Sequence, residues 1–282
     1  MTTRTIGHPE TVAHAGQGAY GPVNGLNLYY EIYGSGRPLV LLHGGFGLTG
    51  MFGDILPLLA EGRQIIAVDL QGHGRTADID RPLRLELMAD DVAALIAHLG
   101  LGQADLMGYS MGGAVALRMA IQHPEVVRKL VVVSTPHKRA GWYPEMVAAM
   151  EQMSAAAMPF MFETPLYQAY VAVAPDPGHF AVLCDKMGDM LRQDYDWSAE
   201  IARLTMPVMI VAGDADGFPP AQAAAFFALL GGGQRDGSWD RSGMTIHRLA
   251  ILPGTTHYDI FSSPALAATV TPFLGTPMAE AE

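Results

Sequence analysis

The chain lacks the residues on which several classes of protein depend. Its one cysteine, Cys184, excludes an internal disulfide framework. Only 17 lysines and arginines stand against 28 aspartates and glutamates, and the formal net charge of −11 argues against a nucleic-acid partner, which requires clustered cations. Paired cysteines, closely spaced histidines and the pattern His-Glu-x-x-His are also missing. We therefore predict neither a metal nor a cofactor.

Long apolar runs are missing as well. No stretch approaches the length needed to cross a bilayer, and the first twenty residues have no apolar region of a secretory signal. The expected protein is cytoplasmic and has no membrane partner. Its 282 residues, 50% of them hydrophobic, suffice to bury one large core as a single domain that carries an insertion.

Short apolar runs that are typical of buried strands alternate with segments of helical spacing. The predicted strands cover residues 38–42, 64–70, 104–107, 130–133, 207–212 and 248–252, with a hairpin-like pair over 23–33; predicted helices cover 51–60, 85–99, 115–123, 221–230 and 264–274. This alternation predicts an α/β fold in which a mainly parallel sheet is flanked by helices. Residues 1–20 show no periodicity, and we expect them to form a flexible tail.

The alternation stops over residues 135–205, where short helical segments rich in methionine and aromatic residues are separated by prolines. We predict a helical cap here, inserted into a core of residues 21–134 and 206–282. Most of its apolar side chains should pack between helices, but a minority should contact a substrate. The expected substrate-binding residues are Tyr109, Met111, Trp142, Met146, Phe160 and Phe162. Residues 231–244, a polar insertion around Trp239, are expected to form a surface loop whose role is open.

One serine lies in a glycine-rich turn between a predicted strand and a predicted helix. The turn reads Gly-Tyr-Ser-Met-Gly-Gly over residues 108–113, with Ser110 at its centre. Such a turn pushes the hydroxyl outward, and the first amides of the helix can stabilise negative charge. The pattern alone is weak, because it arises by chance in roughly one such chain in ten. A glycine-rich turn with an incidental serine is the simpler alternative.

The order of polar residues along the chain strengthens the functional interpretation. Ser110 is followed by Asp216 after a later strand and by His257 after the last strand, which is the order found in α/β-hydrolases. The chain resembles that family over residues 23–274. The matching motifs are Leu42-His43-Gly44-Gly45, Asp69 to Thr76, Gly108 to Gly113, Gly213 to Asp216 and Gly254 to His257. The resemblance implies an eight-stranded-type sheet, with the cap inserted before the acid-bearing strand.

The resemblance also implies a role for each site residue. Ser110 would be the nucleophile, His257 the base that takes its proton, and Asp216 the acid that orients the histidine. Asp214 remains an alternative acid. The oxyanion hole would combine the backbone amide of Met111 with that of Gly45 or Phe46.

These roles imply a cofactor-independent serine hydrolase that cleaves carboxylic esters through an acyl-enzyme, with a small-molecule ester or lactone as its partner. A lactonase that opens acyl-homoserine or macrocyclic lactones is the nearest alternative. Weaker alternatives are a carbon-carbon bond hydrolase, a cofactor-free haloperoxidase-like activity and a non-catalytic ligand receptor. The carbon-carbon hydrolase would need cations such as Lys138, Arg139 or Arg192 for a substrate carboxylate. A serine at the nucleophile position disfavours epoxide hydrolases and dehalogenases. Monomer and homodimer both remain open.

Overall fold

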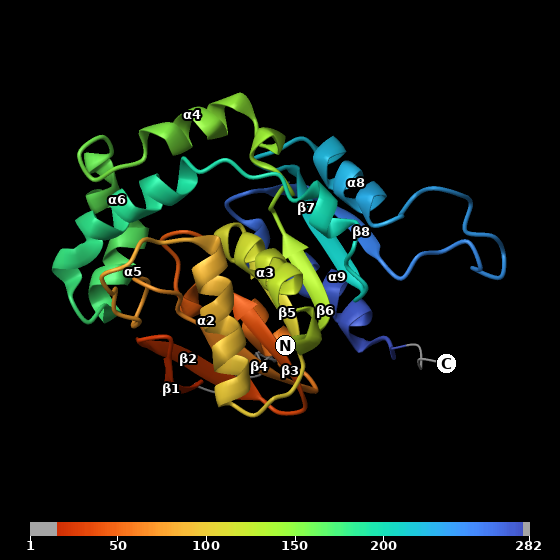
Figure 1. Cartoon of the computed structure of the whole chain (residues 1–282), viewed down its shortest axis with the longest axis horizontal. Coiled ribbons are helices and arrows are strands. Elements are labelled where there is room, and N and C mark those ends of the chain that lie inside the picture. Colours follow the sequence, from red (N-terminus) through yellow and green to blue (C-terminus); the bar gives the residue numbers. More distant parts are fainter. Residues whose placement is uncertain (1–15, 279–282) are drawn as a thin grey trace, which may run out of the picture.

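An eight-stranded sheet organises the computed structural model, which describes residues 16–278 (Figure 1). The strands are β1 (Gln17–Val23), β2 (Leu26–Gly34), β3 (Arg37–Leu42), β4 (Arg63–Val68), β5 (Ala104–Tyr109), β6 (Val127–Val133), β7 (Val208–Ala215) and β8 (Arg248–Thr256). Their order in the sheet is β1-β2-β4-β3-β5-β6-β7-β8. The hairpin β1–β2 is antiparallel to its neighbour β4, and every later pair is parallel. The predicted fold class is confirmed.

Helices cover both faces of the sheet, which explains why its central strands are apolar along their whole length. All six residues of β5 are buried. The core helices are α1 (Ile55–Leu59), α2 (Leu85–His98), α3 (Met111–Gln122), α8 (Pro220–Leu229) and α9 (Pro264–Gly275), with short 3₁₀ turns at Thr49–Phe52, Pro124–Val126 and Ile260–Ser262. Helices α2 and α3 pack together on one face, and α1 packs with α9 on the other. Among the described helices, none has both the length and the apolar character needed to span a membrane.

The segment between β6 and β7 forms a separate group of helices that arches over one end of the core (Figure 1). It contains α4 (Pro144–Gln152), α5 (Pro165–Val173), α6 (Phe180–Leu191) and α7 (Ser198–Ile201), with 3₁₀ turns at Arg139–Gly141, Pro159–Glu163 and Pro177–His179. Prolines begin α4 and α5, where a missing N–H costs nothing. Strands β6 and β7 pair directly, Leu130 opposite Val208, so the insertion leaves the sheet unbroken.

Three expectations about the ends of elements need correction. Strand β1 begins at Gln17, because its residues pair with Tyr29 to Ile32 of β2. The expected tail over residues 1–20 is therefore wrong for its last four residues, and residues 1–15 lie outside the described part. Strand β8 continues to Thr256 through a register shift opposite Gly213 and Ala215, although Pro253-Gly254 resembled the start of a loop. The predicted helix over 51–60 is a 3₁₀ turn followed by the five-residue α1.

Candidate active site

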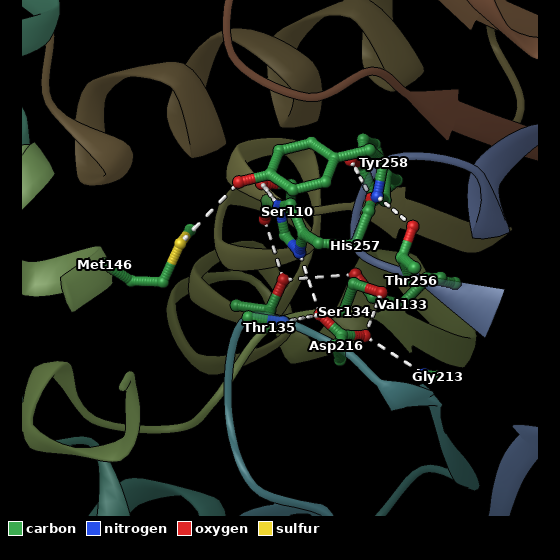
Figure 2. A network of polar contacts seen from close by, with 12 residues as sticks. Ser110, Val133, Ser134, Thr135, Met146, Gly213, Asp216, Thr256, His257 and Tyr258 are labelled. Carbon is green, nitrogen blue, oxygen red and sulfur yellow. Dashed lines mark hydrogen bonds and ion pairs between the residues drawn. The ribbon is translucent and has the colours of Figure 1, made fainter. Parts of the chain in front are cut away.

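Three polar residues singled out in the sequence, Ser110, Asp216 and His257, meet a fourth, Ser134, at the carboxyl edge of four neighbouring strands. Ser110 follows β5, Ser134 follows β6, Asp216 follows β7 and His257 follows β8. Because these strands are parallel and adjacent, their ends present side chains at one edge of the sheet, where α/β proteins bind ligands. Figure 2 shows the four side chains converging.

Ser110 is fixed in a sharp turn between β5 and α3. Its φ of 53° lies in the left-handed region that non-glycine residues seldom adopt. Two hydrogen bonds hold it there: its amide donates to the Val133 carbonyl at 2.9 Å, and the Thr135 hydroxyl donates to its carbonyl at 2.7 Å. The turn also requires a close approach of backbones. A Cβ on Gly108 would lie 2.0 Å from the carbonyl oxygen of Gly112.

The three residues expected to act together form one chain of hydrogen bonds. Ser110 Oγ lies 3.0 Å from His257 Nε2, and His257 Nδ1 lies 2.8 Å from Asp216 Oδ1. The carboxylate neighbour favours a proton on Nδ1, which leaves Nε2 as the acceptor for the serine hydroxyl. The serine is partly exposed, whereas the histidine and aspartate are buried. This arrangement makes the serine hydroxyl accessible and places a base within reach of its proton.

Asp216 is held as a carboxylate by several donors. Its Oδ2 accepts hydrogen bonds from Ser134 Oγ at 2.6 Å and from the Gly213 amide at 3.0 Å, and its Oδ1 also accepts from the Gly217 amide at 2.7 Å. Burial alone would raise the pKa of Asp216, but His257 and these donors outweigh burial and hold the pKa below its usual range. The alternative acid, Asp214, is exposed and accepts from the Gly254 amide at 2.8 Å, so its carboxylate supports a turn.

Three backbone amides beside Ser110 are available for a negatively charged oxygen. Within residues 16–278, the amides of Gly45, Phe46 and Met111 donate to no protein acceptor. The glycine loop, residues 43–47 after β3, lies against the serine, since a Cβ on Gly44 would be 3.3 Å from Ser110 Cβ. Phe46 has a positive φ of 59°, which turns the loop sharply. These amides are the candidate oxyanion hole.

Two buried side chains support this loop from below. His43 Nε2 accepts a hydrogen bond from the Leu70 amide at 3.0 Å, and its Nδ1 donates to the Gly44 carbonyl at 2.7 Å. Burial, together with the nearby His73 ring, lowers the pKa of His43 to about 3, so the ring is neutral. Asp69 accepts from the Thr49 amide at 2.6 Å and fixes the far end of the loop. Both contacts connect the glycine loop to the end of β4.

Aromatic and thioether side chains surround the histidine on one side of the site. The Trp142 ring lies 5.6 Å from that of His257, edge to face. The hydroxyl of Tyr258 donates a hydrogen bond to the sulfur of Met146 in α4, with oxygen and sulfur 3.7 Å apart (Figure 2). The predicted substrate-facing positions of Trp142 and Met146 are therefore beside the reacting groups.

Helix α6 covers the other side of the site. Met187 packs so closely on Gly45 that a Cβ there would lie 2.8 Å from its methyl group. The Phe180 ring packs at a tilt against Phe46, with the ring centroids 5.9 Å apart, and edge to face against Phe162, with the centroids 5.3 Å apart. Phe162 therefore lies one layer behind the glycine loop. The helix is tied to the core through Lys186, whose ammonium donates to Asp78 at 2.6 Å and to the carbonyls of Ile79 and Arg81, each at 2.8 Å.

Two other predicted substrate-binding residues differ in exposure: Tyr109 is buried, with its ring 5.3 Å from that of His257, and Phe160 is exposed. Tyr109 is 5% exposed, its ring packs 4.9 Å from Phe261, and its hydroxyl donates to the His257 carbonyl at 2.5 Å. It therefore supports the histidine loop from beneath, because alternation along β5 turns its ring toward α9. Phe160 is 54% exposed, and no contact among the described residues joins it to the site. Met111 is buried at the start of α3.

Sequence reasoning missed Ser134, Tyr258 and Phe180. Ser134 directly follows a predicted buried strand, and the ends of parallel strands share one edge, so that position was a detectable signal. Phe180 and Tyr258 offered no such signal, because their contacts depend on how helices pack.

The fold and the position of these groups define the class of α/β hydrolases. A family model described as alpha/beta hydrolase fold matches residues 37–176. The chain belongs to this family.

Individual relatives match parts of the chain. The sn-1-specific diacylglycerol lipase ABHD11 of Danio rerio is 31% identical over 150 residues, covering 51% of this chain and 47% of the relative. A soluble epoxide hydrolase of Corynebacterium sp. is 36% identical over 114 residues, covering 39% of each. The chain thus spans less than half the length of these curated relatives. Carboxylesterase CesB of Bacillus subtilis shares the fold, with a TM-score of 0.72 at 17% identity, covering 94% of both chains.

Proposed function

We propose that the protein is a serine hydrolase that cleaves uncharged carboxylic esters through an acyl-enzyme on Ser110. The observation that carries this proposal is the continuous chain from Ser110 Oγ through His257 to Asp216, with the serine at a strained turn. The likeness to a diacylglycerol lipase and to a carboxylesterase fold agrees with this chemistry.

The proposed mechanism assigns one role to each of these groups. His257 Nε2 accepts the proton of Ser110 Oγ as the oxygen attacks the ester carbonyl. Asp216 stabilises the resulting imidazolium and keeps it oriented. The carbonyl oxygen, now negative, accepts hydrogen bonds from the amide of Met111 and from that of Gly45 or Phe46. His257 then gives its proton to the leaving alcohol, and water activated by the same nitrogen hydrolyses the acyl-enzyme.

The side chains around the site favour an apolar, uncharged substrate. Trp142, Met146 and Met187 supply the nearest walls. A substrate carboxylate would need a cation. Of the three candidates, Arg139 is paired with Glu151 and Arg192 with Asp189 at 2.6 Å, while Lys138 lies in the strand-like bridge opposite Asp196. These ion pairs argue against the carbon-carbon bond hydrolase alternative. The serine at position 110 still argues against epoxide hydrolysis, despite the likeness to an epoxide hydrolase.

In this proposal residues 135–205 act as a cap over the ester. Helix α6 contacts the oxyanion loop, and Trp142 and α4 contact the histidine side, so the segment reaches the reacting groups from two directions. Lactones remain possible substrates of the same chemistry, since a cyclic ester forms the same acyl-enzyme.

The test is hydrolysis of p-nitrophenyl esters by the full chain, with fluorophosphonate labelling followed by peptide mapping. We expect label on Ser110 and a burst of p-nitrophenol, and a loss of at least about 10³-fold in kcat for Ser110→Ala. Ser262→Ala serves as the matched control, because this serine lies in a surface turn. A protein that is folded but neither labelled nor active would refute the proposal.

A further inference from the structure

A second cluster of charged side chains lies at the edge of the sheet opposite Ser110. It is formed where β3, β4 and β6 begin, by Arg37, Arg63, Arg128 and Lys129 around Asp105 of β5. Arg37 pairs with Arg63 across β3 and β4, and Asp105 pairs with Lys129 across β5 and β6. The parallel register therefore places these cations on neighbouring strands at one edge.

The single carboxylate is shared by two guanidinium groups. Asp105 is fully buried, and its Oδ2 accepts from Arg63 at 3.1 Å and also from Arg128. The side chains of Arg63 and Arg128 are 9% and 10% exposed. Buried guanidinium groups of this kind require counter-charges, and one aspartate neutralises only one of them.

Lys129 caps the C-terminal end of helix α9. Its ammonium donates to the carbonyls of Phe273 at 2.7 Å, Leu274 at 3.4 Å and Thr276 at 2.5 Å, which offsets the negative end of the helix. Burial first, and then the charge of Arg128, lower the pKa of Lys129 to about 8. Asp105 opposes this shift but does not outweigh burial and the neighbouring cations.

The three arginines of the cluster, Arg37, Arg63 and Arg128, border a hollow of about 240 Å³. It is lined by Arg37, Gly62, Arg63, Arg128 and the stretch from Leu274 to Met278. Within residues 16–278, the buried Nε of Arg128 has no hydrogen-bond acceptor. The cluster therefore combines four cations, one carboxylate, a buried donor on Arg128 and a buried acceptor, Asp105 Oδ1, that both lack partners among the described residues, and space for a small molecule. This excess of cations contrasts with the net charge of −11 of the whole chain.

We propose that this basal hollow binds a phosphate group, either as inorganic phosphate or as the terminal group of a small phosphomonoester. A phosphate dianion would supply the counter-charge that Asp105 cannot, and its oxygens match the forked donors of arginine. The hollow is at the opposite edge of the sheet from Ser110, so a ligand here is separate from the ester substrate.

The experiment is isothermal titration calorimetry of the full chain with inorganic phosphate and, separately, with phenyl phosphate, at constant ionic strength maintained with potassium chloride. We expect saturable binding that weakens at least about tenfold in Arg37→Gln, because each arginine–phosphate contact is charge-assisted. Arg37 is exposed, so this variant should fold. Arg192→Gln, which removes an arginine from an exposed pair in the cap, is the matched control and should bind normally.

Competing outcomes are distinguishable. Tighter binding of phenyl phosphate than of phosphate identifies a phosphomonoester site, and the reverse identifies a site for the free ion. Equal binding of acetate, or no saturable heat with either probe, overturns the proposal. A third outcome also overturns the proposal: a rise in phosphate affinity of tenfold or more when Glu280 and Glu282 are changed to glutamine. In that case the occupant of the hollow would be the chain's own carboxylates. Ester hydrolysis should be unchanged in Arg37→Gln.

Discussion

Ser110 is held in a left-handed backbone conformation that non-glycine residues seldom adopt, and hydrogen bonds from its neighbours stabilise it there. The amide and the carbonyl of Ser110 are both hydrogen-bonded to the end of β6, through Val133 and Thr135. The same strand end supplies Ser134 to the Asp216 carboxylate. Strand β6 therefore supports both ends of the proposed proton path, although it contributes no reacting group.

The two acidic residues after β7 provide a paired test at the residue scale. In Asp216→Asn the amide can no longer accept the Nδ1 proton as a carboxylate does, and we expect kcat to fall by about 10³ to 10⁴-fold. Asp214→Asn keeps an oxygen for the Gly254 amide and should change kcat less than about twofold. The measurement is kcat for a p-nitrophenyl ester. A larger loss in Asp214→Asn than in Asp216→Asn would reverse the assignment of the acid.

Single residues were predictable where chain order and strand ends defined them. Ser110, Asp216 and His257 each follow a recognisable apolar strand, so parallel topology brings them together. The side-chain directions of Tyr109 and Phe160 were not predictable, because adjacency to the serine and an aromatic composition do not specify the direction of a side chain. That direction depends on alternation along β5 and on how the helices of the insertion pack.

At the scale of elements, the first turn of α3 packs with its backbone directly against the backbone at the end of β3. A Cβ on Gly112 would lie 2.4 Å from the carbonyl oxygens of Leu42 and His43. These are backbone atoms of β3 and of the glycine loop, so neither can rotate away. The helix can approach the sheet this closely only without a side chain at that position.

Gly112→Ala is therefore expected to destabilise the fold. Alanine favours a helix by up to about 1 kcal/mol over glycine, but the clash with β3 should outweigh that gain and lower the free energy of unfolding by about 2 kcal/mol. The measurement is the midpoint of urea unfolding followed by circular dichroism. Gly237→Ala is the control, because its Cβ would meet only Met244 at an ordinary 3.5 Å. Equal midpoints for both variants would contradict this account.

The extent of each element was harder to predict than its type. Strand β8 contains Pro253 and Gly254, which resemble a turn, yet it stays paired to β7 through a register shift. Strand β1 has little hydrophobic alternation in its first residues and becomes regular only by pairing with β2. In both strands, a neighbour supplies the hydrogen bonds that define the element, and that neighbour is not apparent from local composition.

For the whole molecule, buried histidines set a sensitivity to acid: burial lowers the pKa of His43 and His73, and also that of His137 and His247. Burial, opposed by contacts to Gln71 and Asp78, lowers the pKa of His73 to about 4, and that of His43 falls to about 3. Below pH 6.5 the unfolded chain binds protons that the folded chain does not, so these groups lower the free energy of unfolding as the pH falls. Asp69 acts in the opposite direction, because burial raises its pKa to about 6.

A difference measurement separates these effects. His73→Asn can keep the hydrogen bond to the Gln71 carbonyl but does not titrate. Between pH 7 and pH 5, wild type should lose about 2 kcal/mol more stability than this variant, as measured by urea unfolding at both pH values. The exposed His98 supplies the control variant, His98→Asn, which should follow wild type. If His73→Asn also follows wild type, His73 is not the source of the acid sensitivity.

The way in which residues 135–205 join the core bears on how this family can diversify. The segment leaves and returns through a short antiparallel neck, where Lys138 lies opposite Asp196, the Arg139 amide donates to Tyr195 at 2.9 Å, and the Trp197 amide donates to His137 at 3.1 Å. Everything beyond the neck lies outside the direct pairing of β6 with β7. Lys138 and Asp196 are thus cut points for grafting the corresponding segment of another α/β hydrolase onto this scaffold. If the segment acts as the proposed cap, such a chimera keeps the proposed reacting groups of the core and takes its choice of substrate from the donor.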